Sequence, residues 1–359
     1  MPSSLHKLFP ESDMHERDLA ARQQMYTTIY SMVFSPCGKY LAAGNNYGYC
    51  AIFSLPSSLS PEATENSWKP LFTFKASDDG PICSMTSTSR ELICGCSGYI
   101  KAWLWSHIIK RTNKLAWALI IPTKSFSVSE INPWLLITRI LYNGEKNLYA
   151  GCGDNLIYIY DLETGSLKST LSGHKDYIHC VTLCNTRQEC VSAAEDGTVR
   201  IWDARSSNEA VCMLEPYKNE MCGRPEFGKW LGCVAMDTGD DWLVCGGGPK
   251  LSLWHMRSLS ATTAFDTPKS CQKHALIHQD TILSAGSEPS VFHWSLNGEL
   301  KAKIPCTPTC VFKVDVNTNS KSNKVLCVAG NSSKLDVSTN FRYKAFSLTF
   351  HSSENVFTK

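Results

Sequence analysis

The 359-residue chain contains no long hydrophobic run. Its longest apolar stretch lies near Leu115–Ile121, well short of the roughly 18–20 residues that a membrane-spanning helix needs. Residues 1–17 lack the apolar core of a signal peptide and carry Glu11, Asp13 and Glu16. These absences argue against a helical membrane span and a secretory leader, and they predict a soluble intracellular protein.

The chain also lacks the cysteine spacing of a zinc site, although it holds 17 cysteines. Tetrahedral zinc sites are built from paired C-x2-C or H-x3-H elements. The closest cysteine pairs have other spacings: Cys94 and Cys96, Cys180 and Cys184, and Cys306 and Cys310. An odd count without a secretion signal fits a reducing compartment. The sequence therefore predicts buried free thiols, no structural metal and no cofactor.

A short segment recurs along the chain, and it carries the fold prediction. Each copy is a hydrophobic residue, one or two small residues and a turn, followed about nine or ten positions later by an aromatic side chain. The small-residue centres lie near Ala43, Cys94, Ala150, Ala193, Cys245, Ala285 and Ala329, and the aromatics that follow are Phe53, Trp103, Tyr160, Trp202, Trp254 and Trp294, with Val337 in the last, degenerate copy. A repeat of roughly 40–50 residues with this content is typical of propeller blades.

We predict an all-β fold, a seven-bladed WD40 β-propeller with four antiparallel strands per blade, over residues 25–350. Residues 1–24 form an N-terminal segment in which a short helix is expected over Asp13–Met25, and residues 351–359 form a disordered tail. Each blade is expected to contain its own outermost strand: Leu71–Lys75, Ala116–Ile121, Ser166–Leu171, Ala210–Leu214, Ala261–Phe265, Glu299–Ile304 and Tyr343–Phe350. The ring then closes by packing and edge pairing between blades seven and one, without a strand exchanged from the N-terminus.

The fourth blade matches the WD40 repeat along its whole length. In it we expect a structural polar set of His174, Ser192, Asp196 and Trp202, in which the serine links the histidine to the indole N–H and the aspartate accepts from the imidazole. The other blades are expected to keep the strands and lose the polar set. The same residue types could make a hydrolase triad. We reject that reading because Ser192 lies inside a strand, not on an exposed elbow, and because no Gly-rich oxyanion segment surrounds it.

Charge is unevenly distributed, although the net charge is only +2. Leu92–Ser129 contains no acidic residue and carries Lys101, Lys110, Arg111, Lys114 and Lys124. Residues 300–350 hold eight basic and two acidic side chains, whereas residues 145–241 hold 16 acidic and nine basic ones. The sequence predicts a basic arc on blades two, one and seven opposite an acidic arc. Lys110, Arg111 and Lys114 are candidate contacts to RNA or, equally, to an acidic partner protein.

Several segments fall outside the strand pattern. Pro56–Pro70 is predicted to be a solvated loop, Trp105–Lys114 a short helix or turn, Pro216–Lys229 a linker, and Asn317–Asn323 a polar hairpin tip. The run Gly246–Pro249 connects two predicted strands and precedes no helix, so it is predicted to be a tight turn and not a phosphate loop.

Four longer strings go beyond a generic WD40 pattern: Phe34–Gly48, Gly173–Cys180, Trp242–Pro249 and Tyr343–Phe350. They resemble the THO complex subunit 6 family, and the resemblance runs from about Met25 to Phe350. It implies a nuclear, non-enzymatic scaffold in the THO/transcription–export complex, with other THO subunits and the mRNA ribonucleoprotein as partners and higher-order assembly as an option. It transfers no catalytic residue.

Two other functions are compatible with a propeller. Trp202-Asp203-Ala204-Arg205 fits the WDxR signature of substrate receptors of cullin–RING ubiquitin ligases, with Arg205 as the contact residue, although the motif is common in WD40 repeats. A propeller enzyme would need carboxylates or histidines that converge on the central channel, and the predicted inner strands mostly lack them.

Overall fold

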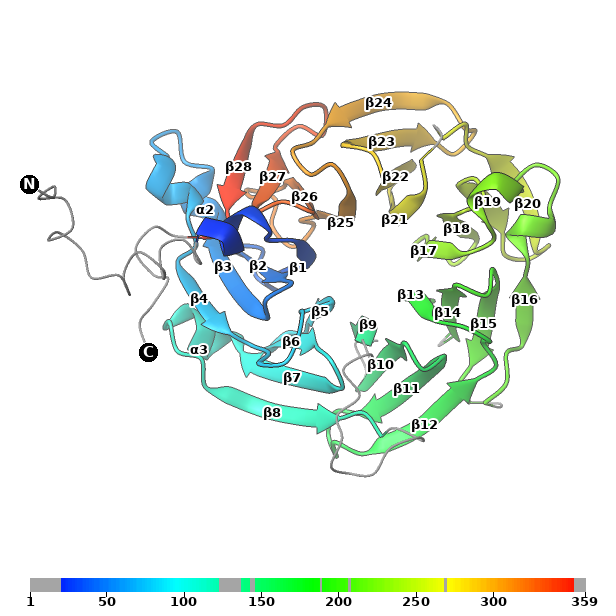
Figure 1. Cartoon of the computed structure of the whole chain (residues 1–359), viewed down its shortest axis with the longest axis horizontal. Coiled ribbons are helices and arrows are strands. Elements are labelled where there is room, and N and C mark those ends of the chain that lie inside the picture. Colours follow the sequence, from blue (N-terminus) through cyan, green and yellow to red (C-terminus); the bar gives the residue numbers. More distant parts are fainter. Residues whose placement is uncertain are drawn as a thin grey trace, which may run out of the picture.

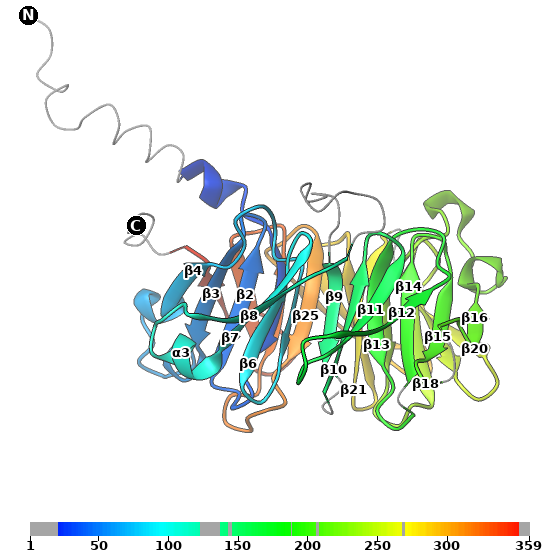
Figure 2. The same ribbon diagram turned by 90° about the horizontal axis from the view of Figure 1, so that it is seen from below.

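The computed structural model describes residues 21–122, 137–142, 146–187, 189–205, 208–267 and 270–351. These residues form a closed ring of seven antiparallel four-stranded sheets, the blades, arranged around a central axis (Figure 1). Seen from the side, the ring is a flat disc (Figure 2). The predicted fold class, a seven-bladed WD40 propeller, is confirmed.

Within each blade the strands follow one another from the ring axis to the rim in chain order. In the described residues the strands are β1 (Ile29–Phe34), β2 (Tyr40–Asn45), β3 (Tyr49–Ser54), β4 (Phe72–Lys75), β5 (Ser84–Ser87), β6 (Glu91–Gly95), β7 (Tyr99–Leu104), β8 (Leu115–Ile120), β9 (Ile137–Tyr142), β10 (Asn147–Cys152), β11 (Leu156–Asp161), β12 (Leu167–Ser172), β13 (Ile178–Leu183), β14 (Glu189–Ala194), β15 (Val199–Asp203), β16 (Cys212–Leu214), β17 (Leu231–Met236), β18 (Trp242–Gly247), β19 (Ser252–His255), β20 (Ser260–Ala264), β21 (Gln272–His278), β22 (Thr281–Gly286), β23 (Ser290–Ser295), β24 (Leu300–Pro305), β25 (Val311–Val316), β26 (Leu326–Gly330), β27 (Lys334–Ser338) and β28 (Phe346–Thr349).

The second strand of each blade explains the recurring small residues. In β2 five of the six residues are buried, and β10, β14 and β22 show the same pattern. Such a strand is covered on both faces by the neighbouring blades, so it reads as a continuous apolar run and tolerates only small side chains at its centre. The outer strands have one face at the rim and are far more exposed, as in β12.

The hydrophobic core is divided among the seven interfaces between neighbouring blades. One cluster combines Tyr149 and Ile159 of blade three with Val181 and Trp202 of blade four, and each of the other clusters likewise draws on two adjacent blades. Burial between blades is therefore what allows the individual repeats to diverge in sequence.

The ring closes without strand exchange, since β28 completes blade seven from the C-terminal end. The expected edge pairing between blades seven and one is wrong, because the strand pairing of the described residues keeps the two sheets separate. Packing and side-chain hydrogen bonds take its place. Nδ2 of Asn317 donates to the carbonyl of Gly38 at 2.8 Å, and Nδ2 of Asn319 donates to that of Ser35 at 2.9 Å. The predicted hairpin tip thus joins the two blades.

The Ser/Pro/Glu-rich segment of blade one, Pro56–Pro70, also contacts blade seven where the ring closes. The prediction of a solvated loop is wrong here, because the segment contains most of α2 (Leu55–Ser58) and the 3-10 helix η2 (Glu65–Trp68). The Trp68 ring stacks on Phe346 of β28, with centroids 5.5 Å apart and an interplanar angle of 12°. The segment is docked by this indole together with Leu55, which is fully buried, and Leu59, which packs against the same cluster.

The linker between blades four and five carries η3 (Pro216–Lys218), η4 (Pro225–Phe227) and a buried arginine. Nε of Arg224 donates to the carbonyl of Gly248 at 2.9 Å, and its Nη2 lies 3.3 Å from the carbonyls of Gly247 and Pro249. The glycine run is therefore a turn whose carbonyls face a cation, which is the opposite of a phosphate-binding loop.

The 17 cysteines all lie within the described residues and are free. Cys94 and Cys245 occupy the small buried strand position, and burial raises the pKa of Cys245 to about 12. In the part of the chain that the structure describes, no cluster of histidine, cysteine or carboxylate side chains is arranged for a metal ion. No helix in that part has the length and apolar character of a membrane span.

The termini are only partly described. Residues 21–25 are helical and sit on one face of the disc (Figure 2), whereas the rest of the helix expected over Asp13–Met25 lies outside the described residues. Of the predicted tail, only His351 is described, and its Nε2 lies 2.7 Å from Oγ1 of Thr27. This contact joins the C-terminal end of the ring to its N-terminal end.

Candidate interaction surfaces

The polar set of blade four is a continuous hydrogen-bonded chain. Nε1 of Trp202 donates to Oγ of Ser192 at 2.8 Å, and that Oγ lies 2.7 Å from Nε2 of His174. On its other side, Nδ1 of His174 lies 3.0 Å from Oδ2 of Asp196. One proton arrangement satisfies every link: indole N–H to serine oxygen, serine O–H to Nε2, and Nδ1–H to carboxylate.

The protonation states follow from the surroundings. Burial lowers the pKa of His174, and the neighbouring carboxylate only partly opposes this effect, so the imidazole is neutral near pH 7. Burial alone would raise the pKa of Asp196, but hydrogen bonds from His174, from the backbone N–H of Lys175 and from Thr198 outweigh it and hold that pKa well below its ordinary value. The set combines a neutral histidine with a fixed anion.

The order of contacts is that of a Ser-His-Asp triad, but access differs. Ser192 is 0% exposed and its oxygen already accepts the indole N–H, so the hydroxyl is enclosed within the sheet. A triad serine must present its oxygen to a substrate carbonyl. The arrangement is suited to holding the loop before β13 against β14 and β15.

Blades five and six keep more of this chemistry than expected. In blade six, Nε1 of Trp294 donates to Oγ of Ser284 at 3.0 Å, which is the same serine–indole pair. In blade five, Nε1 of Trp254 donates to Ser252 at 2.9 Å. The expectation that the other blades lose the whole polar set is therefore wrong for the indole bond, because a buried N–H needs an acceptor in any blade.

The basic segment of blade two lies at the rim of the ring (Figure 1). It consists of α3 (Trp105–Ile109) and the turn that follows, where Arg111 adopts a φ of 58°. Lys110, Arg111 and Lys114 are exposed, and among the described residues they form no salt bridge. The predicted helix or turn is confirmed. Lys124, which belongs to the acid-free stretch Leu92–Ser129, lies outside the described residues.

Arg205 is placed on a different part of the ring, after β15 of blade four. Its Nε and Nη2 each donate to the Asp203 carboxylate at 2.9 Å. This bidentate contact lowers the pKa of Asp203 to about 2, while the arginine side chain stays 62% exposed. The structure thus does not bring Arg205 together with the basic segment of blade two.

A surface that the sequence analysis missed surrounds the ring axis. In several blades the inner strand has a β-bulge at its second residue, which leaves that residue without a partner on the next strand. These residues are Tyr30, His179, Gly232, Lys273 and Phe312, and all of them line one cavity of about 590 Å³. In these five blades the bulge places the second residue of the inner strand at the cavity, and in four of them that residue carries a large side chain.

The cavity at the axis is aromatic and basic on one side. The rings of Tyr30 and Phe312 are 5.1 Å apart, and Nζ of Lys273 lies 4.8 Å from the Phe312 centroid. On the other side, Nε2 of His179 lies 2.6 Å from Oε2 of Glu195. The signal in the sequence is the second position of four inner strands, which holds Tyr30, His179, Lys273 or Phe312 where alternation alone gives no reason for a large or charged residue.

Comparison with known proteins follows the same blades. The family model "WD domain, G-beta repeat" matches residues 165–203, from the outer strand of blade three through β15. The chain is 47% identical to THO complex subunit 6 of Homo sapiens over 333 residues, which is 92% of this chain and 95% of that protein. It is 45% identical to the THO complex subunit 6 homolog of Danio rerio, covering 91% and 98%, and 34% identical to THO complex subunit 6 of Drosophila melanogaster, covering 92% and 90%.

Proposed function

This chain belongs to the THO complex subunit 6 family, and on that basis we propose that it is a non-enzymatic scaffold subunit of the THO/transcription–export complex. In this role it supports assembly of the complex and couples transcription and mRNA processing to nuclear export of mRNA. Its partners are other THO subunits and, through them, the mRNA ribonucleoprotein, and it acts in the nucleus.

The observation that carries this proposal is the extent of the similarity. An identity of 47% extends over 92% of the chain, so it covers all seven blades and not only the one that matches the general repeat. A rigid ring with divergent loops is also the kind of scaffold on which binding surfaces are usually carried. The enclosed Ser192 supports the non-enzymatic part of the proposal.

The test is affinity purification of the tagged chain from nuclear extract, with and without RNase, followed by mass spectrometry. Recovery of THO subunits that survives RNase is the expected result, because the contacts of a scaffold are made by protein. Loss of all THO subunits under both conditions would contradict the proposal.

The same experiment separates the second candidate, a substrate receptor of a cullin–RING ligase. This candidate rests on Arg205, which is exposed and held in a fixed orientation by Asp203. Recovery of a cullin and its adaptor that is lost in Arg205→Ala would favour it. A matched control is Arg187→Ala, which removes a different arginine of the same blade.

A further inference from the structure

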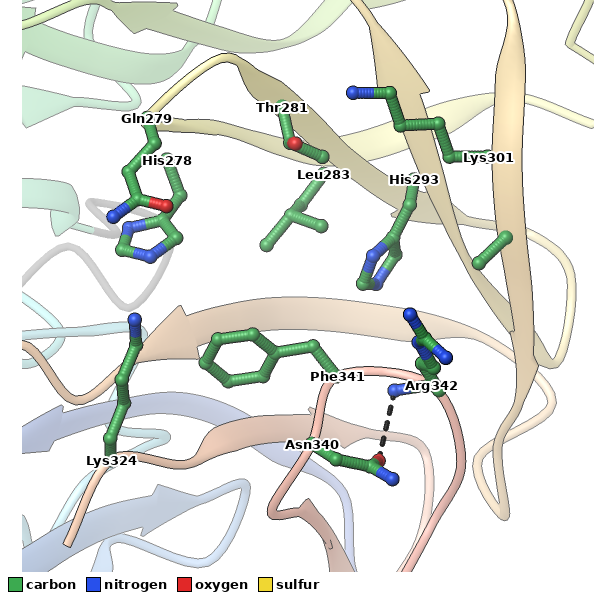
Figure 3. A pocket seen from close by; sticks show the side chains of 11 residues that line it. His278, Gln279, Thr281, Leu283, His293, Lys301, Lys324, Asn340, Phe341 and Arg342 are labelled. Carbon is green, nitrogen blue, oxygen red and sulfur yellow. Dashed lines mark hydrogen bonds between the residues drawn. The ribbon is translucent and has the colours of Figure 1, made fainter. Parts of the chain in front are cut away.

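A second cavity, of about 570 Å³, lies between blades six and seven. Its upper wall in Figure 3 comes from the β21–β22 hairpin, β23 and β24 of blade six, and its lower wall comes from two loops of blade seven. The size lies within the range of ordinary ligand sites. Since the two walls belong to different repeats, no single repeat contains the site.

The charged side chains that line this cavity are all cationic. Lys301 comes from blade six, and Lys324 and Arg342 come from blade seven. All three are exposed, no carboxylate lines the cavity, and within the described part of the chain none of the three forms a salt bridge. Three cations with no counter-ion among the described residues make the rim complementary to an anionic ligand.

A buried histidine points to a ligand independently of the charges. His293 of β23 is only 7% exposed and lines the cavity, yet its Nε2 has no hydrogen-bond partner among the described residues. Nε2 of His278, on the β21–β22 hairpin, is also buried and likewise has no hydrogen-bond partner among the described residues. Buried polar atoms are normally paired, and those that are not call for an explanation. Burial lowers the pKa of His293 to about 4, so near pH 7 the ring is neutral, with one donor and one acceptor nitrogen.

The apolar part of the cavity is held in a strained loop. Phe341 adopts a φ of 58°, a region that bulky residues rarely occupy. Its ring lies 6.0 Å from the His278 ring and 5.4 Å from Nζ of Lys324. Together with the buried Leu283 it gives the cavity an apolar floor beneath the cationic rim.

We propose that this cavity binds an acidic peptide segment of a partner protein, with an apolar side chain against Phe341 and Leu283 and carboxylates on Lys301, Lys324 and Arg342. A peptide is favoured over RNA because the cations surround an apolar floor, whereas a phosphate backbone requires a basic track.

This inference goes beyond the assembly role and does not rest on it, because it concerns binding by the isolated chain. The test begins with a phage-displayed library of random dodecapeptides, selected on the purified full-length protein and depleted on Lys301→Glu/Arg342→Glu. The expected sequences carry two or more carboxylates around one apolar residue. The fluorescein-labelled synthetic peptide should bind the double variant at least tenfold more weakly than the wild type.

The matched control is Lys321→Glu/Lys334→Glu, which makes the same charge change at two exposed lysines of blade seven outside the cavity and should leave the Kd within twofold. His293→Phe keeps an aromatic ring of similar shape and should weaken binding several-fold by removing the nitrogen. Thermal melting of each variant checks its fold. The proposal is overturned if no peptide distinguishes the wild type from the double variant, or if the peptides that do so are not acidic. It is also overturned if labelled oligouridine, and not peptide, responds to the double variant.

Discussion

Blade four and the cavity between blades six and seven each contain a buried histidine, but the two histidines differ in how their ring nitrogens are hydrogen-bonded. His174 uses both ring nitrogens within the protein, one on Ser192 and one on Asp196. His293 is equally buried, but its Nε2 has no partner within the described residues. Polar groups that are fully paired inside a fold stabilise it, whereas unpaired ones carry a desolvation cost that a ligand can remove. The paired network of blade four is therefore suited to stability, and the cavity is where we propose that a ligand binds.

The largest effect is expected where the paired network meets the core. Trp202→Ala should lower the free energy of unfolding by about 3–5 kcal/mol, because the indole is 1% exposed and packs between blades three and four. Denaturant unfolding followed by circular dichroism measures the change. Tyr177→Ala, which removes a 46% exposed ring from the same blade, is the control and should cost far less. A shift in melting of only a degree or so for Trp202→Ala would show that blade four is not built in this way.

The second-largest effect on stability is expected from a variant that removes hydrogen bonds but keeps the packing. Asp196→Asn should cost about 2–3 kcal/mol, because the amide cannot accept at once from His174, Lys175 and Thr198. The control is Glu195→Gln at the preceding position, where the carboxylate is 42% exposed and bonds only His179 among the described residues. Equal stabilities for the two variants would remove the contrast between paired and unpaired regions.

A pH series tests the unpaired histidine. The pKa of His293 is lowered to about 4, below the roughly 6.5 expected for the unfolded chain. The unfolded state therefore binds the proton first, so stability is lost as the pH falls below about 6.5 and the loss levels off near pH 4. His293→Phe should remove about 1–2 kcal/mol of the difference in unfolding free energy between pH 8 and pH 5.

The measurement is urea unfolding of both proteins at pH 8, 6.5 and 5. His174 and His278, whose pKa values are also lowered, remain in both proteins and supply a common background slope. Identical pH dependence for the wild type and His293→Phe would show that His293 is not held neutral by burial.

The smallest effect on stability is expected at the exposed basic segment of blade two. Reversal of Lys110, Arg111 and Lys114 to glutamate should change the unfolding free energy by no more than about 0.5 kcal/mol, because these side chains are exposed and unpaired among the described residues. If the segment contacts RNA, the variant should be retained less by immobilised RNA at low salt, and the difference should shrink as salt is added. The comparator is Lys301→Glu/Arg342→Glu, which should leave RNA retention unchanged. Unchanged retention in the blade two variant would exclude the RNA contact.

The repeats could be predicted because their signals are local. A small buried strand such as Tyr40–Asn45, and an aromatic ten residues later, are dictated by packing within one blade and against the next. Blade four could be predicted down to its bonds, since all four members of its polar set lie within one short stretch of sequence. Outer strands were less well defined: β16 covers only Cys212–Leu214 of the predicted Ala210–Leu214, because an edge strand is paired on one side alone.

Features that depend on two blades could not be read in the same way. The stacking of Trp68 on Phe346 and the hydrogen bond from Asn317 to Gly38 could not be predicted, because the partners lie about one full ring apart in the sequence. The bulges that place Tyr30, Lys273 and Phe312 at the cavity around the axis are likewise visible only once the inner strands are paired and the ring is closed.

The sequence by itself therefore determined the repeat, the number of blades, the strand order and the polar set of blade four, since each depends on residues that are near neighbours along the chain. Only the tertiary structure decided how the ring closes, which side chains face the axis, and that Lys301, His293, Phe341 and Arg342 surround one cavity. The physical reason is that these contacts join separate repeats, and ring closure alone fixes which blade faces which.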